Sequence, residues 1–166
     1  KKMNNIFKKL KKVFNTFENY NCFVCSTSNP IGLKLDIKFS GNSAYANFNL
    51  SNLYSGFPSI IHGGIQASII DEIGFWGMFN ARRQIGFTQK LEIDYLSKIE
   101  TDVNLKVLGK EVSLIDKTSK VEVSIFHDSK LKTKGLVSYK LISDSAIKKF
   151  FGDDFYIEFM RSFRND

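Results

Sequence analysis

The run from His62 to Glu72 contains the residues best suited to chemistry. It opens with His62-Gly63-Gly64, and because glycine has no Cβ a ligand can approach that backbone closely. If a helix starts there, its first N–H groups have no internal partner and its dipole favours negative charge. The Gly64 N–H would then polarise a carbonyl as in an oxyanion hole. A tight turn that uses glycine only for its geometry is the alternative.

Asp71 and Glu72 are the only charged residues between Gly63 and Asn80. This stretch is apolar on nearly every face, which predicts a buried helix. A buried carboxylate is costly and is retained mainly for a partner or for function. Asp71 follows Gly64 by seven residues, about 700° of rotation, so both face nearly the same way, whereas Glu72 is turned by about 100°. We expect Asp71 to act as general base or nucleophile and Glu72 to be a structural partner or a rim residue.

The elements that must position these groups are about six strands around that helix. Alternating apolar residues predict strands over 33–39 and 44–50 before the helix, and over 90–95, 103–115, 121–125 and 131–142 after it, with a bulge at Gly109. The short connections favour antiparallel neighbours. A curved sheet wrapped around the long helix is the economical solution. The predicted class is therefore α+β with the hotdog fold.

The chain ends predict additional helices on one central domain. We expect a basic amphipathic helix over 1–20, the hotdog domain over 21–143, and a helical tail over 144–166 that is broken at Gly152 and packs on the domain. The first helix should pack its apolar stripe on the domain, and an anchor on anionic lipid is the alternative.

Charge and hydropathy exclude several kinds of partner. The net charge of +7 is concentrated in six lysines among the first twelve residues, and the remainder has 18 basic against 17 acidic residues. A nucleic-acid partner is therefore not expected. No apolar run reaches the ~18 residues of a membrane span, and no apolar segment follows the lysine-rich start as in a secretory signal. We expect a cytoplasmic protein.

Cys22 and Cys25 form a single C-x-x-C pair. A structural zinc site needs four ligands, and one chain offers only His62 and His127 besides. We expect two small buried thiols, no metal and no cofactor, with a zinc shared between two chains as the remaining alternative.

Several motifs together resemble those of the hotdog thioesterases of the phenylacetate-pathway (PaaI-like) type. That family has H-G-G followed by an acid nine positions after the His, which matches His62 to Asp71. Three further segments, 25–33, 56–58 and 88–96, are similar to the opening segment, the substrate-side loop and the strand after the helix. Some relatives have Asn six positions before the His, where this chain has Gly56.

The resemblance implies hydrolysis of an acyl-coenzyme A thioester. It implies that Asp71 is the base or nucleophile, that the Gly64 N–H polarises the carbonyl, and that Thr88 holds the attacking water. Substrate contacts would come from His62, Gly63, Gly56, Phe57 and Gln66. Thr88 shares the parity of the polar Lys90, so it points inward only if the strand bends or starts later. A hotdog protein that binds acyl-CoA or an acyl carrier without turnover is the alternative function.

The spacing of the two groups also predicts an oligomer. Seven residues of helix separate Gly64 from Asp71 by ~10.5 Å of rise, too far for both to serve one thioester. Two antiparallel helices related by a two-fold axis can supply one group each. We expect a homodimer or a dimer of dimers.

Overall fold

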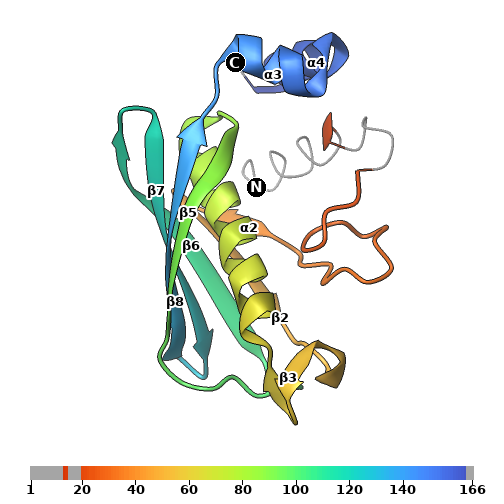
Figure 1. The fold of residues 1–166 in the computed structure, drawn as a ribbon, viewed down its shortest axis with the longest axis vertical. Helices are drawn as coiled ribbons and strands as arrows, with labels where there is room; N and C mark the ends of the chain where they lie inside the picture. The colour runs from red at the N-terminus through yellow and green to blue at the C-terminus, as the bar shows by residue number, and fades with distance from the viewer. Residues whose placement is uncertain (1–12, 15–19, 164–166) are drawn as a thin grey trace.

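The computed structural model describes residues 13–14 and 20–163 of the chain. In chain order the elements are β1 (Lys38–Ser40), β2 (Ser43–Phe48), η1 (Asn52–Tyr54), β3 (Ser55–Phe57), β4 (Ile60–Ile61), α2 (Gly63–Arg82), β5 (Gly86–Tyr95), β6 (Leu105–Ile115), β7 (Thr118–His127), β8 (Lys130–Leu141), α3 (Asp144–Phe151) and α4 (Asp153–Phe163). Six strands form one antiparallel sheet in the order β1-β2-β6-β7-β8-β5, and β3 pairs with β4. The sheet curves around α2 (Figure 1). The predicted α+β hotdog fold is confirmed.

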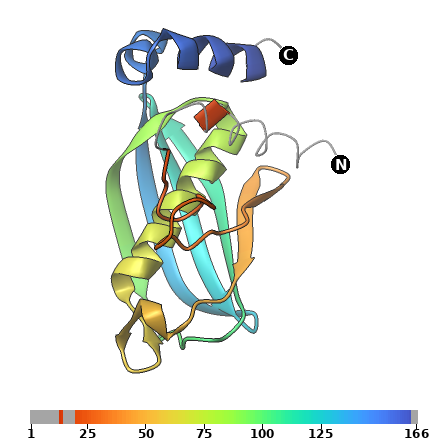
Figure 2. The same ribbon diagram turned by 90° about the vertical axis from the view of Figure 1, so that its right-hand side faces the viewer.

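Helix α2 forms the centre of the core, lying along one face of the sheet (Figure 2). Its inward residues are almost fully buried: Ile69, Ile70, Ile73, Trp76, Met78 and Phe79. Burying each such side chain contributes about 1.5–3 kcal/mol. Two strand glycines allow this close approach, since a Cβ at Gly109 would lie 2.8 Å from Ile73 Cγ2 and one at Gly135 would lie 2.5 Å from Ile70 Cγ2.

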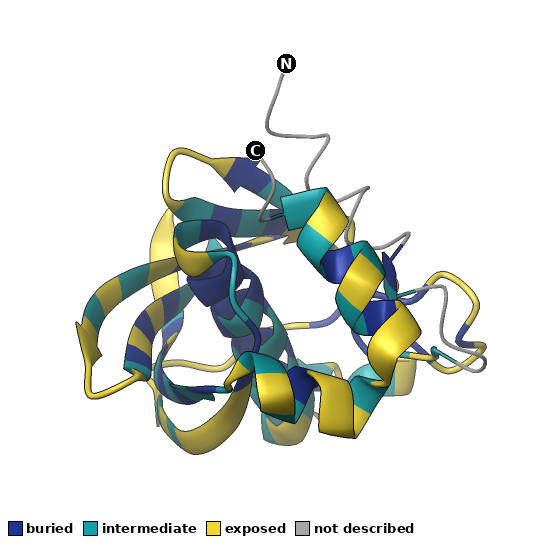
Figure 3. Cartoon of the chain, turned by 90° about the horizontal axis from the view of Figure 1, so that it is seen from above, coloured by how far each residue is buried: buried dark blue, intermediate teal, exposed yellow. Residues whose placement is uncertain are grey.

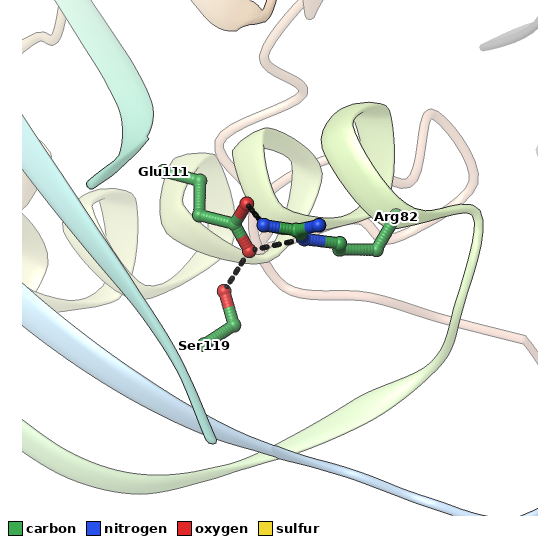
Figure 4. A network of polar contacts seen from close by, with 3 residues as sticks. All are labelled: Arg82, Glu111 and Ser119. Atoms are coloured by element: carbon green, nitrogen blue, oxygen red, sulfur yellow. Dashed lines mark hydrogen bonds and ion pairs between the residues drawn. The ribbon is translucent and has the colours of Figure 1, made fainter. Parts of the chain in front are cut away.

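The last turn of α2 is tied to the sheet by a polar network (Figure 4). Arg82 forms an ion pair with Glu111 of β6, with Nη2 2.6 Å from Oε2, and Ser119 of β7 donates to the same carboxylate at 2.6 Å. Arg83 ends the helix in the left-handed conformation with φ 53°. The helix therefore ends two residues beyond the predicted limit near Asn80, where this network holds it.

The prediction of a bulge at Gly109 was wrong. Strand β6 is continuous through Gly109, and its register with β7 shifts between Glu111 and Ser113, so that Val112 is the extra residue. Gly109 instead leaves room for the backbone and side chain of Ile73. Gly109 therefore allows α2 to pack closely against β6.

Two larger differences from the prediction lie before α2. The first strand was expected from Leu33 but starts at Lys38, because the N–H groups of Leu33 and Leu35 donate to the carbonyls of Phe23 and Val24 in the preceding loop. The segment around Gly56 was expected as a loop but forms the hairpin β3–β4. This hairpin leads directly into the start of α2.

The C-terminal helices lie across one end of the domain (Figures 1 and 3). They are separated at Gly152, which has φ 86°, as predicted. Phe155 and Phe159 are buried, and the Phe159 ring lies 6.3 Å from that of Phe79. Among the described helices, none combines the length and hydrophobicity that a membrane span requires.

The predicted N-terminal helix falls mainly outside the described residues. Of that segment, Val13 is helical and buried, and Phe14 lies 5.5 Å from Phe155 and 6.5 Å from Trp76 between ring centroids. These two side chains pack on the domain.

Candidate active site

Asp71 and Thr88 are brought together by α2 and β5. The Thr88 hydroxyl donates to Asp71 Oδ1 at 2.7 Å. A register shift between Thr88 and Lys90 leaves Gln89 as an extra residue in β5. This bulge reverses the alternation, so that Thr88 pairs with the buried Tyr139 and faces α2. The sequence predicted an inward-pointing Thr88 only if the strand bends or starts later, and this bulge meets that condition.

Tyr139 of β8 is a further member of this group and was not predicted from the sequence. Its hydroxyl donates to the Asp71 carbonyl at 2.5 Å and lies 3.4 Å from Asp71 Oδ1. It is fully buried, and burial raises its pKa well above the ordinary value. Gly74 makes room for it, because a Cβ there would lie 2.3 Å from the hydroxyl. A tyrosine in an alternating strand resembles an ordinary core residue, so the sequence carried no separate signal for it.

The start of α2 is capped by His62. Its Nδ1 accepts from the Gly64 N–H at 2.8 Å, which places the proton of a neutral imidazole on Nε2. The Gly64 N–H expected to polarise a carbonyl therefore already has a partner. Within the described part of the chain, the Gly63 N–H has none, and the Tyr95 hydroxyl donates to the Gly63 carbonyl at 2.9 Å. Gly56 packs on this cap, since a Cβ there would lie 3.0 Å from His62 Cδ2.

Of the other predicted substrate contacts, Gln66 is bound within the chain and Phe57 is exposed. Gln66 is buried, donates from Nε2 to the Ile61 carbonyl at 3.2 Å and accepts from Thr133 at 2.6 Å. Its amide therefore joins the helix to the sheet within the chain. Phe57, at the tip of the β3–β4 hairpin, is 74% exposed.

Glu72 lines the same cavity as Asp71, and both of its oxygens make hydrogen bonds within the chain, as expected of a structural partner. Trp76 Nε1 donates to its Oε1 at 2.7 Å, and the Cys22 thiol donates to its Oε2 at 3.4 Å. The enclosure of the carboxylate raises its pKa to about 7. The pKa of Cys22 is lowered, because the Cys25 thiol and backbone N–H groups point at its sulfur. The Cys25 thiol donates and is buried, so its pKa is raised.

The acid and the helix start open onto different cavities. One cavity, of about 280 Å³, is lined by Asp71, Glu72, Thr88, Cys22 and the aromatic residues Phe14, Tyr20, Phe75, Trp76, Phe87 and Phe151, together with Ile85 and Gly86. A second, of about 390 Å³, is lined by Leu53, Tyr54, Ser55, His62, Gly64 and Ile65. A larger hollow of about 740 Å³ lies along β2 and β6, and no α2 residue contributes to its lining. Asp71 and the start of α2 therefore line separate cavities in the described part of the chain.

Comparisons with known proteins agree with this architecture. Residues 59–134, from the hairpin into β8, match the family model described as the Thioesterase superfamily. A solved thioesterase superfamily protein from Shewanella loihica is 25% identical, with a TM-score of 0.56, and the match covers 66% of this chain and 91% of that one. A comparison with curated protein sequences finds no match.

Two more distant structures share the fold. A hypothetical thioesterase from Streptococcus pneumoniae, solved with coenzyme A, is 18% identical with a TM-score of 0.61, covering 65% of this chain and 85% of that one. A phenylacetic acid degradation-related protein from Ralstonia eutropha, described as a putative thioesterase, is 12% identical with a TM-score of 0.59, covering 66% and 86%. The matched segment and the shared hotdog fold make this chain similar to proteins of the thioesterase superfamily.

Proposed function

We propose that the protein hydrolyses the thioester of an acyl-coenzyme A to a free acid and coenzyme A. The observation that carries this proposal is the Asp71 carboxylate, held by Thr88 at 2.7 Å beside an apolar cavity. The superfamily match and the coenzyme A in the Streptococcus pneumoniae structure support a thioester of coenzyme A as the substrate. The Ralstonia eutropha structure supports a relationship to the phenylacetate-pathway type.

The two carboxylate oxygens of Asp71 differ in their hydrogen-bond partners. Oδ1 accepts from Thr88 and lies 3.4 Å from the Tyr139 hydroxyl, whereas Oδ2 has no partner among the described residues. Oδ2 can therefore take a proton from water as the water oxygen attacks the carbonyl carbon. The C–S bond then breaks, its electron pair stays on sulfur, and the proton passes to the leaving thiolate. Direct attack by Oδ2, followed by hydrolysis of the anhydride, is the nucleophilic alternative.

Thr88 and Tyr139 are positioning residues in this scheme. The Thr88 hydroxyl gives its one hydrogen to Asp71, so towards a water it can only accept. Tyr139 holds the backbone carbonyl of Asp71 at 2.5 Å. Together they fix the carboxylate where the helix meets β5.

The carbonyl oxygen requires a donor at the start of α2. The Gly63 N–H is free in the described protomer, while the Gly64 N–H becomes available only if the His62 ring turns away. We therefore assign Gly63 as the first donor, with Gly64 joining it after that movement. Both lie at the positive end of a 20-residue helix, where developing negative charge is favoured.

The complete site takes one half from each of two chains. Asp71 and the helix start open onto separate cavities in one protomer, in keeping with their ~10.5 Å separation along the helix. Strand β5 is at the sheet edge and pairs only with β8 among the described strands. A second copy that pairs with this edge would cover Thr88, which is exposed in one chain, and place a partner helix beside Asp71. This arrangement supports a homodimer or a dimer of dimers.

The cavity beside Asp71 favours an aromatic or long apolar acyl group. Its lining includes the aromatic residues Phe75, Trp76, Phe87 and Phe151. Phe79 is buried in the core, and Phe57 is on the exposed hairpin.

Binding of acyl-CoA or an acyl carrier without turnover is the second candidate function. The observation that favours it is the His62–Gly64 hydrogen bond, which occupies one of the two backbone donors expected to polarise the thioester. A binding protein needs no free donor at that position. Turnover is therefore the property that separates the two functions.

The experiment is thiol release from a panel of acyl-CoAs of graded length and aromaticity. We expect release by the wild-type protein, fastest with aromatic or longer apolar acyl groups, and a loss of release in Asp71→Asn with binding retained. Binding of the panel with no release from any member would refute hydrolysis and support the binding function.

A further inference from the structure

Three side chains with metal-binding atoms converge beside α2, apart from the oxygens assigned to the reaction. The sulfurs of Cys22 and Cys25 and a carboxylate oxygen of Glu72 all lie within 4.8 Å of one another. In the sequence, only cysteine and histidine stood out as possible ligands. The fold brings Glu72 to the C-x-x-C pair from 50 residues away.

The separations suit a tetrahedral zinc ion. Bonds of about 2.3 Å to sulfur and 2.0–2.2 Å to oxygen at tetrahedral angles place sulfur and oxygen ~3.6 Å apart and two sulfurs ~3.8 Å apart. Cys22 Sγ and Glu72 Oε2 are 3.4 Å apart. Side-chain adjustments of less than about 1 Å therefore suffice to coordinate the ion.

The surroundings hold each ligand in a suitable orientation. The Cys25 N–H donates to Cys22 Sγ at 3.4 Å, and the Val24 N–H also points at that sulfur. Trp76 Nε1 holds Oε1 of Glu72 at 2.7 Å and leaves Oε2 directed at the sulfurs. Such outer contacts are what orients a ligand in metal sites.

A divalent cation would balance the charge of the three ligands once both thiols are deprotonated. Two thiolates and a carboxylate would bring three negative charges together, and the described residues that line the adjoining cavity include no lysine or arginine. Uncompensated buried charge is costly, and a divalent ion removes most of it. Thiolate ligands select zinc and related soft ions over magnesium or calcium.

We propose that Cys22, Cys25 and Glu72 bind one Zn²⁺ per chain, with its fourth position open to the cavity. Cys22 and Glu72 line that cavity, so water can reach the ion from there. The ion would join the loop that carries the cysteines to α2 one residue away from Asp71. The proposal does not depend on the proposed hydrolysis.

Cobalt titration tests the site on the full, reduced and chelator-treated chain. Co²⁺ should bind one ion per chain with a sulfur-to-cobalt charge-transfer band, and Zn²⁺ should displace it and raise the melting temperature. Cys22→Ser and Cys25→Ser should lose the band, and Glu72→Gln should weaken binding at least about tenfold. Asp71→Asn is the matched control, since it changes the adjacent carboxylate and should leave cobalt binding unchanged.

A second measurement needs no variant. One equivalent of Zn²⁺ should protect both thiols of the wild-type protein from a thiol reagent. Absence of the band, half an ion per chain, unprotected thiols, or wild-type affinity in Glu72→Gln would each overturn the site as proposed. Hydrolysis lost in Asp71→Asn with cobalt binding retained would show that the two proposals stand separately.

Discussion

Replacing Gly63 by proline removes one N–H from the start of α2 and little else. Gly63 is the first residue of the helix, where proline is well tolerated. His62 before it has φ −59° and ψ 137°, in the region that a residue preceding proline prefers. The deleted N–H makes no hydrogen bond among the described residues, so the fold loses no internal contact.

The magnitude follows from the role assigned to that N–H. Removal of one oxyanion-hole donor lowers kcat by about 10²–10³, or about 2.7–4 kcal/mol. The free energy of unfolding should change by less than about 1 kcal/mol, because proline also restricts the unfolded chain. We therefore expect a large loss of turnover in a protein with nearly unchanged stability.

The assay is thiol release under saturating acyl-CoA, with thermal melting measured alongside. Gly63→Ala is the control, because its Cβ also lies about 3.3 Å from the Tyr95 hydroxyl but the N–H is kept. Gly63→Ala should stay within a few-fold of wild-type kcat. A folded Gly63→Pro protein with wild-type turnover would refute the assignment of this donor.

Three further predictions test the remaining parts of the site. Thr88→Val should lower kcat/KM about 10–150-fold, because a hydrogen bond to a charged group contributes about 1.5–3 kcal/mol. Thr88→Ser keeps the hydroxyl and should stay within a few-fold of wild type. Equal losses in both variants would contradict the hydrogen-bonding role. Asp71→Asn should lower turnover about 10²-fold or more. Mixing Asp71→Asn chains with Gly63→Pro chains should restore activity, because each heterodimer has one site with neither substitution. No restoration in proven heterodimers would show that the site lies within one chain. Gly74→Ala places a Cβ 2.3 Å from the Tyr139 hydroxyl and should destabilise the fold by about 1–3 kcal/mol, with reduced kcat, whereas wild-type melting would show that Tyr139 yields easily.

The sequence by itself determined the architecture and predicted Asp71 as the reacting carboxylate. An uninterrupted apolar helix between alternating strands has few ways to be buried, and a curved sheet around it is the simplest. Asp71 was recognisable because charge is rare in such a helix. The break at Gly152 was also predictable, since glycine adopts positive φ at little cost.

The tertiary structure alone decided which side chains reach Asp71. The bulge at Gln89 is not apparent in the sequence, yet it turns Thr88 inward, because one extra residue exchanges the two faces of a strand. The contact of Tyr139 with Asp71 and that of Cys22 with Glu72 likewise come from long-range packing, across 68 and 50 residues. Local periodicity can assign a residue to a face of a strand or helix, but contacts between distant elements depend on how the whole chain packs.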